Sequence, residues 1–230
     1  MTGTDAEMSD TGVANQGALI GEAARDLRAG RVIGLPTDTV YGLAAALDRP
    51  DAIADLYAIK GRPTDRPLPI LLAGIDGLEL VALPVSARVR TFLNAIWPGG
   101  LTVALVARDG LPPETIAPDG TVGVRVPDAS LAVAVLRAIG GAAAVTSANR
   151  SGEPALRTDG DVSAAFGDRV GITLPGASRE GALPSTVVGF DVDALVLHRS
   201  GSVPWERLLT VWEASDRGPV LATAGPGTVR

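Results

Sequence analysis

The 230-residue sequence contains no cysteine, so the chain has no disulfide, thiolate nucleophile, cysteine-ligated zinc site or iron–sulfur cluster. Histidine occurs once, at His198, and the sequence has no His-Glu-x-x-His metal helix. It also lacks a Gly-x-Ser-x-Gly nucleophile elbow and a Gly-x-Gly-x-x-Gly dinucleotide turn. Interpretations as a common metalloprotease, hydrolase or Rossmann enzyme therefore lose their main support.

Lysine is almost absent as well, because Lys60 is the single lysine and the remaining basic residues are arginines. A coding bias in a GC-rich genome explains most of this preference but gives no reason for the lysine that is retained. The net charge of −6 and the aromatic content of 3% argue against a surface that binds nucleic acid non-specifically or stacks bases. A local basic pocket is still compatible with this overall charge.

No apolar run approaches the roughly 20 residues that a membrane span needs. Residues 1–16 are small, polar and mildly acidic, without the basic start and apolar stretch of a secretory signal. We therefore expect a flexible N-terminal lead-in over residues 1–16 and a cytoplasmic protein without membrane association. Residues 215–230 are rich in glycine, proline, alanine and threonine and predict a flexible tail. One folded domain is left over residues 17–214.

The apolar residues of this domain alternate between helical spacing and short strand-like runs. The pattern predicts helices over residues 18–29, 51–59, 84–97 and 131–139 and from Pro204, and strands over 32–35, 68–73, 101–107, 121–126, 142–146, 185–190 and 195–199. Alternating helices and strands predict α/β layers, and the short connection between the last two strands predicts an antiparallel pair. The expected fold is a single α/β domain with a twisted, mixed parallel and antiparallel sheet.

Polar side chains gather where two of these strands end. Residues 36–43 (Pro-Thr-Asp-Thr-Val-Tyr-Gly-Leu) include Thr39, and residues 146–152 (Thr-Ser-Ala-Asn-Arg-Ser-Gly) include Ser147 and Asn149. Ligand sites of α/β sheets gather at strand ends, and short hydroxyl and amide side chains suit small polar ligands. Helix-capping and ordinary turns have the same composition. Both interpretations are open on this evidence.

A cluster of cations occupies residues 60–67, Lys-Gly-Arg-Pro-Thr-Asp-Arg-Pro, where two prolines stiffen the chain around Lys60, Arg62 and Arg66. Such a loop suits a polyphosphate, because arginine supplies a bidentate fork and lysine a mobile charge. A solvated surface turn is the alternative. The segment is not a Walker A loop, because Gly-Lys-Ser/Thr is absent.

Two arginines lie in predicted strands. Arg125 interrupts an otherwise apolar strand, where it either pairs with an internal carboxylate or meets an anionic ligand in a cleft. Arg199 ends the last strand beside His198, and strand alternation directs the two side chains to opposite faces. We assign no chemistry to His198.

Six ordered segments together resemble the YrdC/Sua5 family over roughly residues 18–203. They are residues 36–43, 60–63, 97–102 (Trp-Pro-Gly-Gly-Leu-Thr), 124–127 (Val-Arg-Val-Pro), 147–152 and 185–188 (Ser-Thr-Val-Val). The resemblance implies a mixed, twisted sheet with a locally positive concave face, in the short form of the family. It also implies an enzyme that condenses L-threonine, bicarbonate and ATP into threonylcarbamoyl-adenylate and pyrophosphate, for the threonylcarbamoyladenosine modification of tRNA.

The resemblance further implies roles for ten residues, with Lys60 and Arg62 as the catalytic pair. The expected ATP contacts are Lys60, Arg62, Arg66, Thr121, Asn149 and Arg199, and the expected threonine contacts are Thr39, Arg125, Ser147 and Ser185. Mg²⁺ is expected to arrive with ATP, and no residue is assigned as its ligand. The product is expected to pass to the tRNA threonylcarbamoyl-transfer machinery, without direct tRNA binding. Residues 155–158, Ala-Leu-Arg-Thr, depart from the family's Ser-Pro-Thr pattern, so no role is carried over there.

Two other functions share the implied fold. A carbamoyltransferase-type domain, as in hydrogenase-maturation proteins, comes with further domains and cysteine-rich zinc motifs, which a cysteine-free chain of this length does not have. A non-catalytic RNA-binding module would use the same positive face, but the acidity and few aromatics disfavour it.

Overall fold

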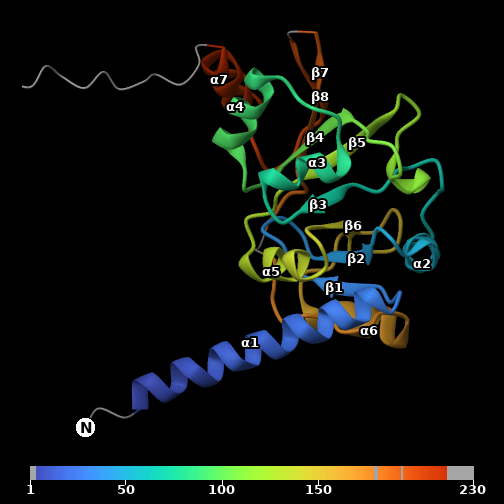
Figure 1. The fold of residues 1–230 in the computed structure, drawn as a ribbon. Helices are drawn as coiled ribbons and strands as arrows, with labels where there is room; N and C mark the ends of the chain where they lie inside the picture. Colours follow the sequence, from blue (N-terminus) through green and yellow to red (C-terminus); the bar gives the residue numbers. More distant parts are fainter. Residues whose placement is uncertain (1–3, 179–180, 193, 217–230) are drawn as a thin grey trace, which may run out of the picture.

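Eight strands form one mixed sheet in the order β1-β2-β6-β3-β5-β4-β7-β8 in the computed structural model, which describes residues 4–178, 181–192 and 194–216 (Figure 1). The strands are β1 (Ile33–Leu35), β2 (Gly42–Ala46), β3 (Ile70–Leu72), β4 (Leu101–Val106), β5 (Thr121–Arg125), β6 (Ala142–Ser147), β7 (Thr186–Asp191) and β8 (Ala194–Arg199). β3 pairs in parallel with β5 and β4 with β7, while the other neighbours are antiparallel. The predicted mixed α/β sheet is confirmed, and β7 and β8 form the predicted antiparallel pair.

Helices cover both faces of the sheet. They are α1 (Thr4–Arg28), α2 (Pro50–Lys60), α3 (Leu78–Val81), α4 (Ala87–Ile96), α5 (Ser130–Ala138), α6 (Asp159–Phe166) and α7 (Trp205–Ser215), with short 3-10 turns at Ile75–Gly77, Pro113–Thr115 and Gly167–Arg169. Along β2, Leu43 and Ala45 pack with α2 and α6, whereas Ala44 and Ala46 pack with α1 and α5, as the period of two requires. Because both faces of β2 are buried, this strand is apolar, and the polar side chains lie in the loops at its ends.

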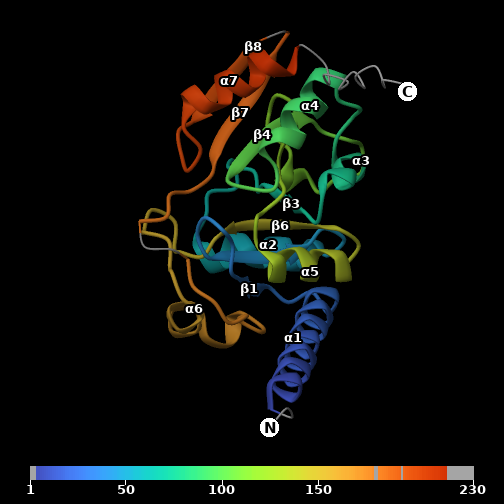
Figure 2. The same cartoon turned by 90° about the vertical axis from the view of Figure 1, so that its left-hand side faces the viewer.

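A third apolar cluster lies beneath α4 and α7, which run side by side at the β7–β8 end of the sheet (Figures 1 and 2). The rings of Phe92, Phe190 and Trp212 meet there, with centroids 5.2 to 6.1 Å apart. Such pairs contribute packing beyond their buried area. The cluster packs α4 and α7 against β4, β7 and β8. These strands lie beside the part of the sheet that α2 and α5 cover.

The first and last helices extend into segments that the sequence pattern predicted to be flexible. α1 begins at Thr4, so residues 4–16, expected as a flexible lead-in, are helical, and this part of the helix extends away from the rest of the protein (Figure 2). Ser215, expected as the first residue of the tail, is the last residue of α7, and residues 217–230 lie outside the described part of the chain. The sequence pattern also does not predict β2 or α6. None of the described helices is long and apolar enough to cross a membrane.

Candidate active site

A cavity of about 400 Å³ opens where the strand ends and loops meet, and we call it the central cavity. The β1–β2 loop, the end of β6 with the loop after it, and the segments that carry Arg62, Arg125 and Arg199 all contribute to it. Seven of the ten predicted site residues line it, namely Thr39, Arg62, Arg125, Ser147, Asn149, Ser185 and Arg199. Thr37, Thr102 and Glu153 also line it and were not among the predicted residues.

Arg125 is buried at the end of β5, with 5% of its surface exposed. Its Nε donates to the Gly99 carbonyl at 2.8 Å, its Nη1 to Thr39 Oγ1 at 2.6 Å, and its Nη2 to the Asp38 carboxylate. Burial lowers the pKa of Arg125, and the charge of Arg199 lowers it further. The neighbouring Asp38 carboxylate raises it. Arg125 therefore pairs with an internal carboxylate, and because it also lines the cavity, its contact with an anionic ligand stays a prediction.

Arg62 and Arg199 have no carboxylate partner in the part of the chain that the structure describes. Within the described residues, no carboxylate oxygen lies within 4.0 Å of either guanidinium. Arg62 donates to the carbonyls of Arg66 and Pro67, both at 3.1 Å, and Arg199 donates to the Ser185 carbonyl at 2.8 and 3.2 Å and to its Oγ at 3.2 Å. These neutral acceptors orient the two arginines without cancelling their charge.

The arginines also repel one another across the cavity. Withdrawal from water lowers the pKa of Arg199, and the charge of Arg62 lowers it further, although Arg199 is an exposed residue. The pKa of Arg62 is lowered by burial first and then by Arg66, with Tyr57 opposing. An anion between these cations would relieve the repulsion, so the site is suited to bind negatively charged groups.

Lys60 does not line the central cavity, although the resemblance implies a phosphate contact. It is 3% exposed, and its Nζ donates to the Ser147 carbonyl and, at 2.9 Å each, to the carbonyl and Oδ1 of Asn149. Burial, and then the charge of Arg62, lowers the pKa of Lys60 to about 8. Because an ammonium has three donors, all of its protons are directed at the end of β6.

Asn149 holds this strand end together. Its Oδ1 accepts from Lys60 and, at 2.6 Å, from the Ser147 hydroxyl, and its Nδ2 donates to the carbonyls of Arg150 and Glu153 at 2.8 and 2.7 Å. Since the Ser147 proton is donated to Asn149, Ser147 Oγ can take part in a further hydrogen bond only as an acceptor. Lys60 and Asn149 thus position Ser147 at the cavity wall.

Besides Lys60, two predicted nucleotide contacts lie outside the cavity lining. Thr121 donates its hydroxyl to Asp119 Oδ1 at 2.7 Å and so stabilises the turn before β5. The Arg66 side chain is exposed. The Arg66 carbonyl accepts hydrogen bonds from the Tyr57 hydroxyl at 2.8 Å and from Arg62. Ligand contacts at these two residues stay predictions. His198, to which no chemistry was assigned, is exposed and also lies outside the lining.

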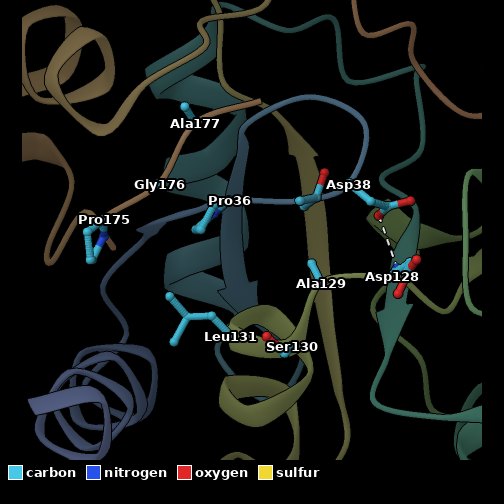
Figure 3. A pocket seen from close by; sticks show the side chains of 10 residues that line it. Pro36, Asp38, Asp128, Ala129, Ser130, Leu131, Pro175, Gly176 and Ala177 are labelled. Carbon is cyan, nitrogen blue, oxygen red and sulfur yellow. Dashed lines mark hydrogen bonds between the residues drawn. The ribbon is translucent and has the colours of Figure 1, made fainter. Parts of the chain in front are cut away.

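A second hollow of about 470 Å³ also borders the β1–β2 loop (Figure 3). Its wall comes from residues 36–38, 128–131 and 175–177, and its charged members are Asp38 and Asp128. The Asp128 N–H donates to Asp38 Oδ1 at 3.1 Å, the contact drawn in Figure 3. With two carboxylates and no cation in its wall, this hollow does not suit a phosphate, and the central cavity is the better candidate.

Known proteins that resemble this chain come from one family. The family model Sua5_yciO_yrdC, described as "Telomere recombination", matches residues 25–201. A threonylcarbamoyl-AMP synthase of Bacillus subtilis is 36% identical over 193 residues, which are 84% of this chain and 56% of that protein. A threonylcarbamoyl-AMP synthase of Nitrosococcus oceani is 36% identical over 165 residues, 72% of this chain and 89% of that protein.

The structural comparison gives the same family. The crystal structure of Pyrococcus abyssi Sua5 complexed with L-threonine superposes with a TM-score of 0.79 at 31% identity, over 84% of this chain and 56% of that chain. The chain therefore spans about half the length of the B. subtilis and P. abyssi proteins and most of the N. oceani one. From the match of the family model, the identity to these relatives and the shared fold, the chain belongs to the Sua5/YciO/YrdC family.

Proposed function

We propose that this chain is an L-threonylcarbamoyladenylate synthase, which condenses L-threonine, bicarbonate and ATP into threonylcarbamoyl-AMP and pyrophosphate. The observation that carries the proposal is the convergence of Arg62, Arg125 and Arg199 on one cavity that is also lined by hydroxyl groups. Relatives named threonylcarbamoyl-AMP synthase, and the Sua5 structure with L-threonine, support the same substrates.

The cavity suits two different anions. Arg125 donates to the Thr39 hydroxyl, and Ser185 is a further buried hydroxyl residue of the same cavity. This part of the lining fits a compact carboxylate and its neighbouring polar groups, such as those of threonine. Arg62 and Arg199 carry charge without a carboxylate partner in the described chain, and we assign them to the phosphates of ATP. Binding both substrates in one cavity brings the reacting groups together.

The reaction needs no nucleophile from the protein. The threonine amine and bicarbonate give a carbamate and water, and a carbamate oxygen then forms a bond to the α-phosphorus as the bond to pyrophosphate breaks. Catalysis then depends on alignment and on cations that stabilise charge on the phosphate oxygens. A cavity with three arginines and several hydroxyls supports this chemistry in a chain without cysteine.

Lys60 has a positioning role in this proposal rather than a direct phosphate contact. Its three hydrogen bonds fix the backbone and side chain that hold Ser147 and Asn149 at the cavity wall. Mg²⁺ would accompany ATP and neutralise phosphate charge. The labile product would pass to the tRNA threonylcarbamoyl-transfer machinery, and a cytoplasmic location belongs to the same proposal.

The proposal is tested by the mass of the nucleotide product. The protein is incubated with MgATP, L-threonine and ¹³C-labelled bicarbonate, and the products are separated rapidly because the adenylate is labile. We expect an AMP adduct that contains threonine and one labelled carbon, and the label should be absent when unlabelled bicarbonate is supplied. An AMP product without threonine, or no product, would contradict the proposal.

A further inference from the structure

One negative charge stands among the cations of the central cavity. Its charged lining residues are Arg62, Arg125, Arg199 and Glu153. Within the described residues, the Glu153 carboxylate has no cation within 4.0 Å and accepts no side-chain hydrogen bond. Glu153 is therefore an exposed residue of the cavity lining whose carboxylate has no cationic partner in the described part of the chain.

The backbone around Glu153 is fixed next to the segment that carries Arg62. The Glu153 carbonyl accepts from Asn149 Nδ2 at 2.7 Å, and its N–H donates to the Arg150 carbonyl at 3.0 Å. The Ser151 N–H donates to the Lys60 carbonyl at 2.8 Å, which attaches this turn to the end of α2. Glu153 and Arg62 thus reach the cavity from two joined backbone segments, at the part of the site assigned to phosphates.

A lone carboxylate at this place would weaken the binding of a triphosphate unless a cation lies between them. Mg²⁺ is commonly held by one or two carboxylates together with substrate phosphates and several waters. One carboxylate beside phosphate-binding arginines matches this donor set. We propose that Glu153 binds the Mg²⁺ of MgATP, directly or through a metal-bound water. The inference rests on the proposed function, since it takes ATP as the nucleotide.

Binding of a non-hydrolysable ATP analogue tests this inference without requiring turnover. Its affinity is measured by calorimetry with excess Mg²⁺ and with EDTA, for the wild type, Glu153→Gln and Asp65→Asn. We expect Mg²⁺ to strengthen binding to the wild type and this gain to be about tenfold smaller in Glu153→Gln, the loss of one metal contact. Without metal, Glu153→Gln should bind the analogue at least as tightly as the wild type, because a repulsive charge is gone.

Asp65→Asn is the matched control. Asp65 is exposed and acts on Arg62 through its charge, but it does not line the cavity. Asp65→Asn therefore removes one negative charge near Arg62, as Glu153→Gln does, and Mg²⁺ should strengthen analogue binding to it as much as to the wild type. Mn²⁺ in place of Mg²⁺ gives a second readout, because bound Mn²⁺ enhances the relaxation of water protons. In the complex of protein, Mn²⁺ and ATP analogue, this enhancement should differ from the wild type in Glu153→Gln but not in Asp65→Asn.

Three outcomes would overturn the inference. An equal Mg²⁺ gain in Glu153→Gln and the wild type would show that Glu153 does not bind the metal. A selective loss of L-threonine affinity, with the Mg²⁺ gain intact, would assign Glu153 to the substrate amine instead. If the wild type binds no analogue at all, the proposed function itself fails. This result differs from an equal Mg²⁺ gain in the wild type and Glu153→Gln, which contradicts only the role of Glu153.

Discussion

Replacing Arg125 with alanine should separate the two halves of the central cavity. Three of the five guanidinium N–H groups donate to Gly99, Thr39 and Asp38, which leaves two for a ligand carboxylate. Hydrogen bonds to charged groups contribute about 1.5–3 kcal/mol. The loss of even one such bond should weaken L-threonine binding by about 10-fold to 150-fold, and the loss of both should weaken it further. Binding of an ATP analogue should weaken only slightly, because Arg62 and Arg199 remain.

The same substitution also affects stability, so the assay must control for it. Arg125 and Asp38 form a largely buried ion pair, with side chains 6% and 18% exposed. Removing one partner of a buried pair costs about 3–5 kcal/mol, and the exposure of Asp38 favours the lower end. Asp38 also keeps its hydrogen bond from the Asp128 N–H. Affinities should be measured by calorimetry at a temperature where circular dichroism shows a folded protein.

Two further variants make the result interpretable. Arg125→Lys retains the charge but not the fork, and we expect an intermediate loss of threonine affinity. Arg66→Ala removes an exposed arginine that does not line the cavity and should leave threonine binding unchanged. If Arg125→Ala loses ATP affinity while threonine binds normally, our division of the cavity is wrong.

Three other predictions follow from single contacts. Ser147→Ala should keep the fold, seen as an unchanged melting temperature, but lose activity, and an unchanged rate would return Ser147 to a turn-forming role. Burial lowers the pKa of Lys60 from 10.5 to about 8 in the folded protein, so between these pH values the unfolded chain binds more protons than the folded one. The contribution of Lys60 to the free energy of unfolding should therefore rise as the pH increases from about 8 to 10.5. Urea unfolding should show this rise in the wild type relative to Lys60→Met, and parallel pH profiles would refute it. In Gly201→Ala the new Cβ would lie 2.3 Å from the Pro184 carbonyl oxygen, so we expect Ser185 to shift and threonine affinity to fall, which calorimetry would detect.

Most of the sheet could be predicted from its apolar strands, but β2 could not. Its sequence, Gly-Leu-Ala-Ala-Ala, has low strand propensity. It is a strand because it pairs with both β1 and β6, and all five residues are buried between helices. The start of α6 carries a local signal, since Thr158 and Asp161 form a reciprocal capping box.

The site shows the same division between local and long-range information. The cation-rich loop and the polar strand ends were visible in the sequence, and seven of the ten residues carried over by resemblance line one cavity. Where the Lys60 ammonium points depends on Ser147 and Asn149, almost ninety residues away, and no local pattern reports such a contact. Glu153 gave no signal either, because an acidic residue in a polar turn is common on protein surfaces.

Release of pyrophosphate from ATP tests the central claim most directly. The purified chain is supplied with MgATP, and pyrophosphate is followed with L-threonine and bicarbonate both present, with each omitted in turn, and with L-serine in place of L-threonine. We expect sustained release only when L-threonine and bicarbonate are both present, because the carbamate that attacks the α-phosphorus needs both. Equal release of pyrophosphate without L-threonine would contradict the assignment of this chain as a threonylcarbamoyl-adenylate synthase.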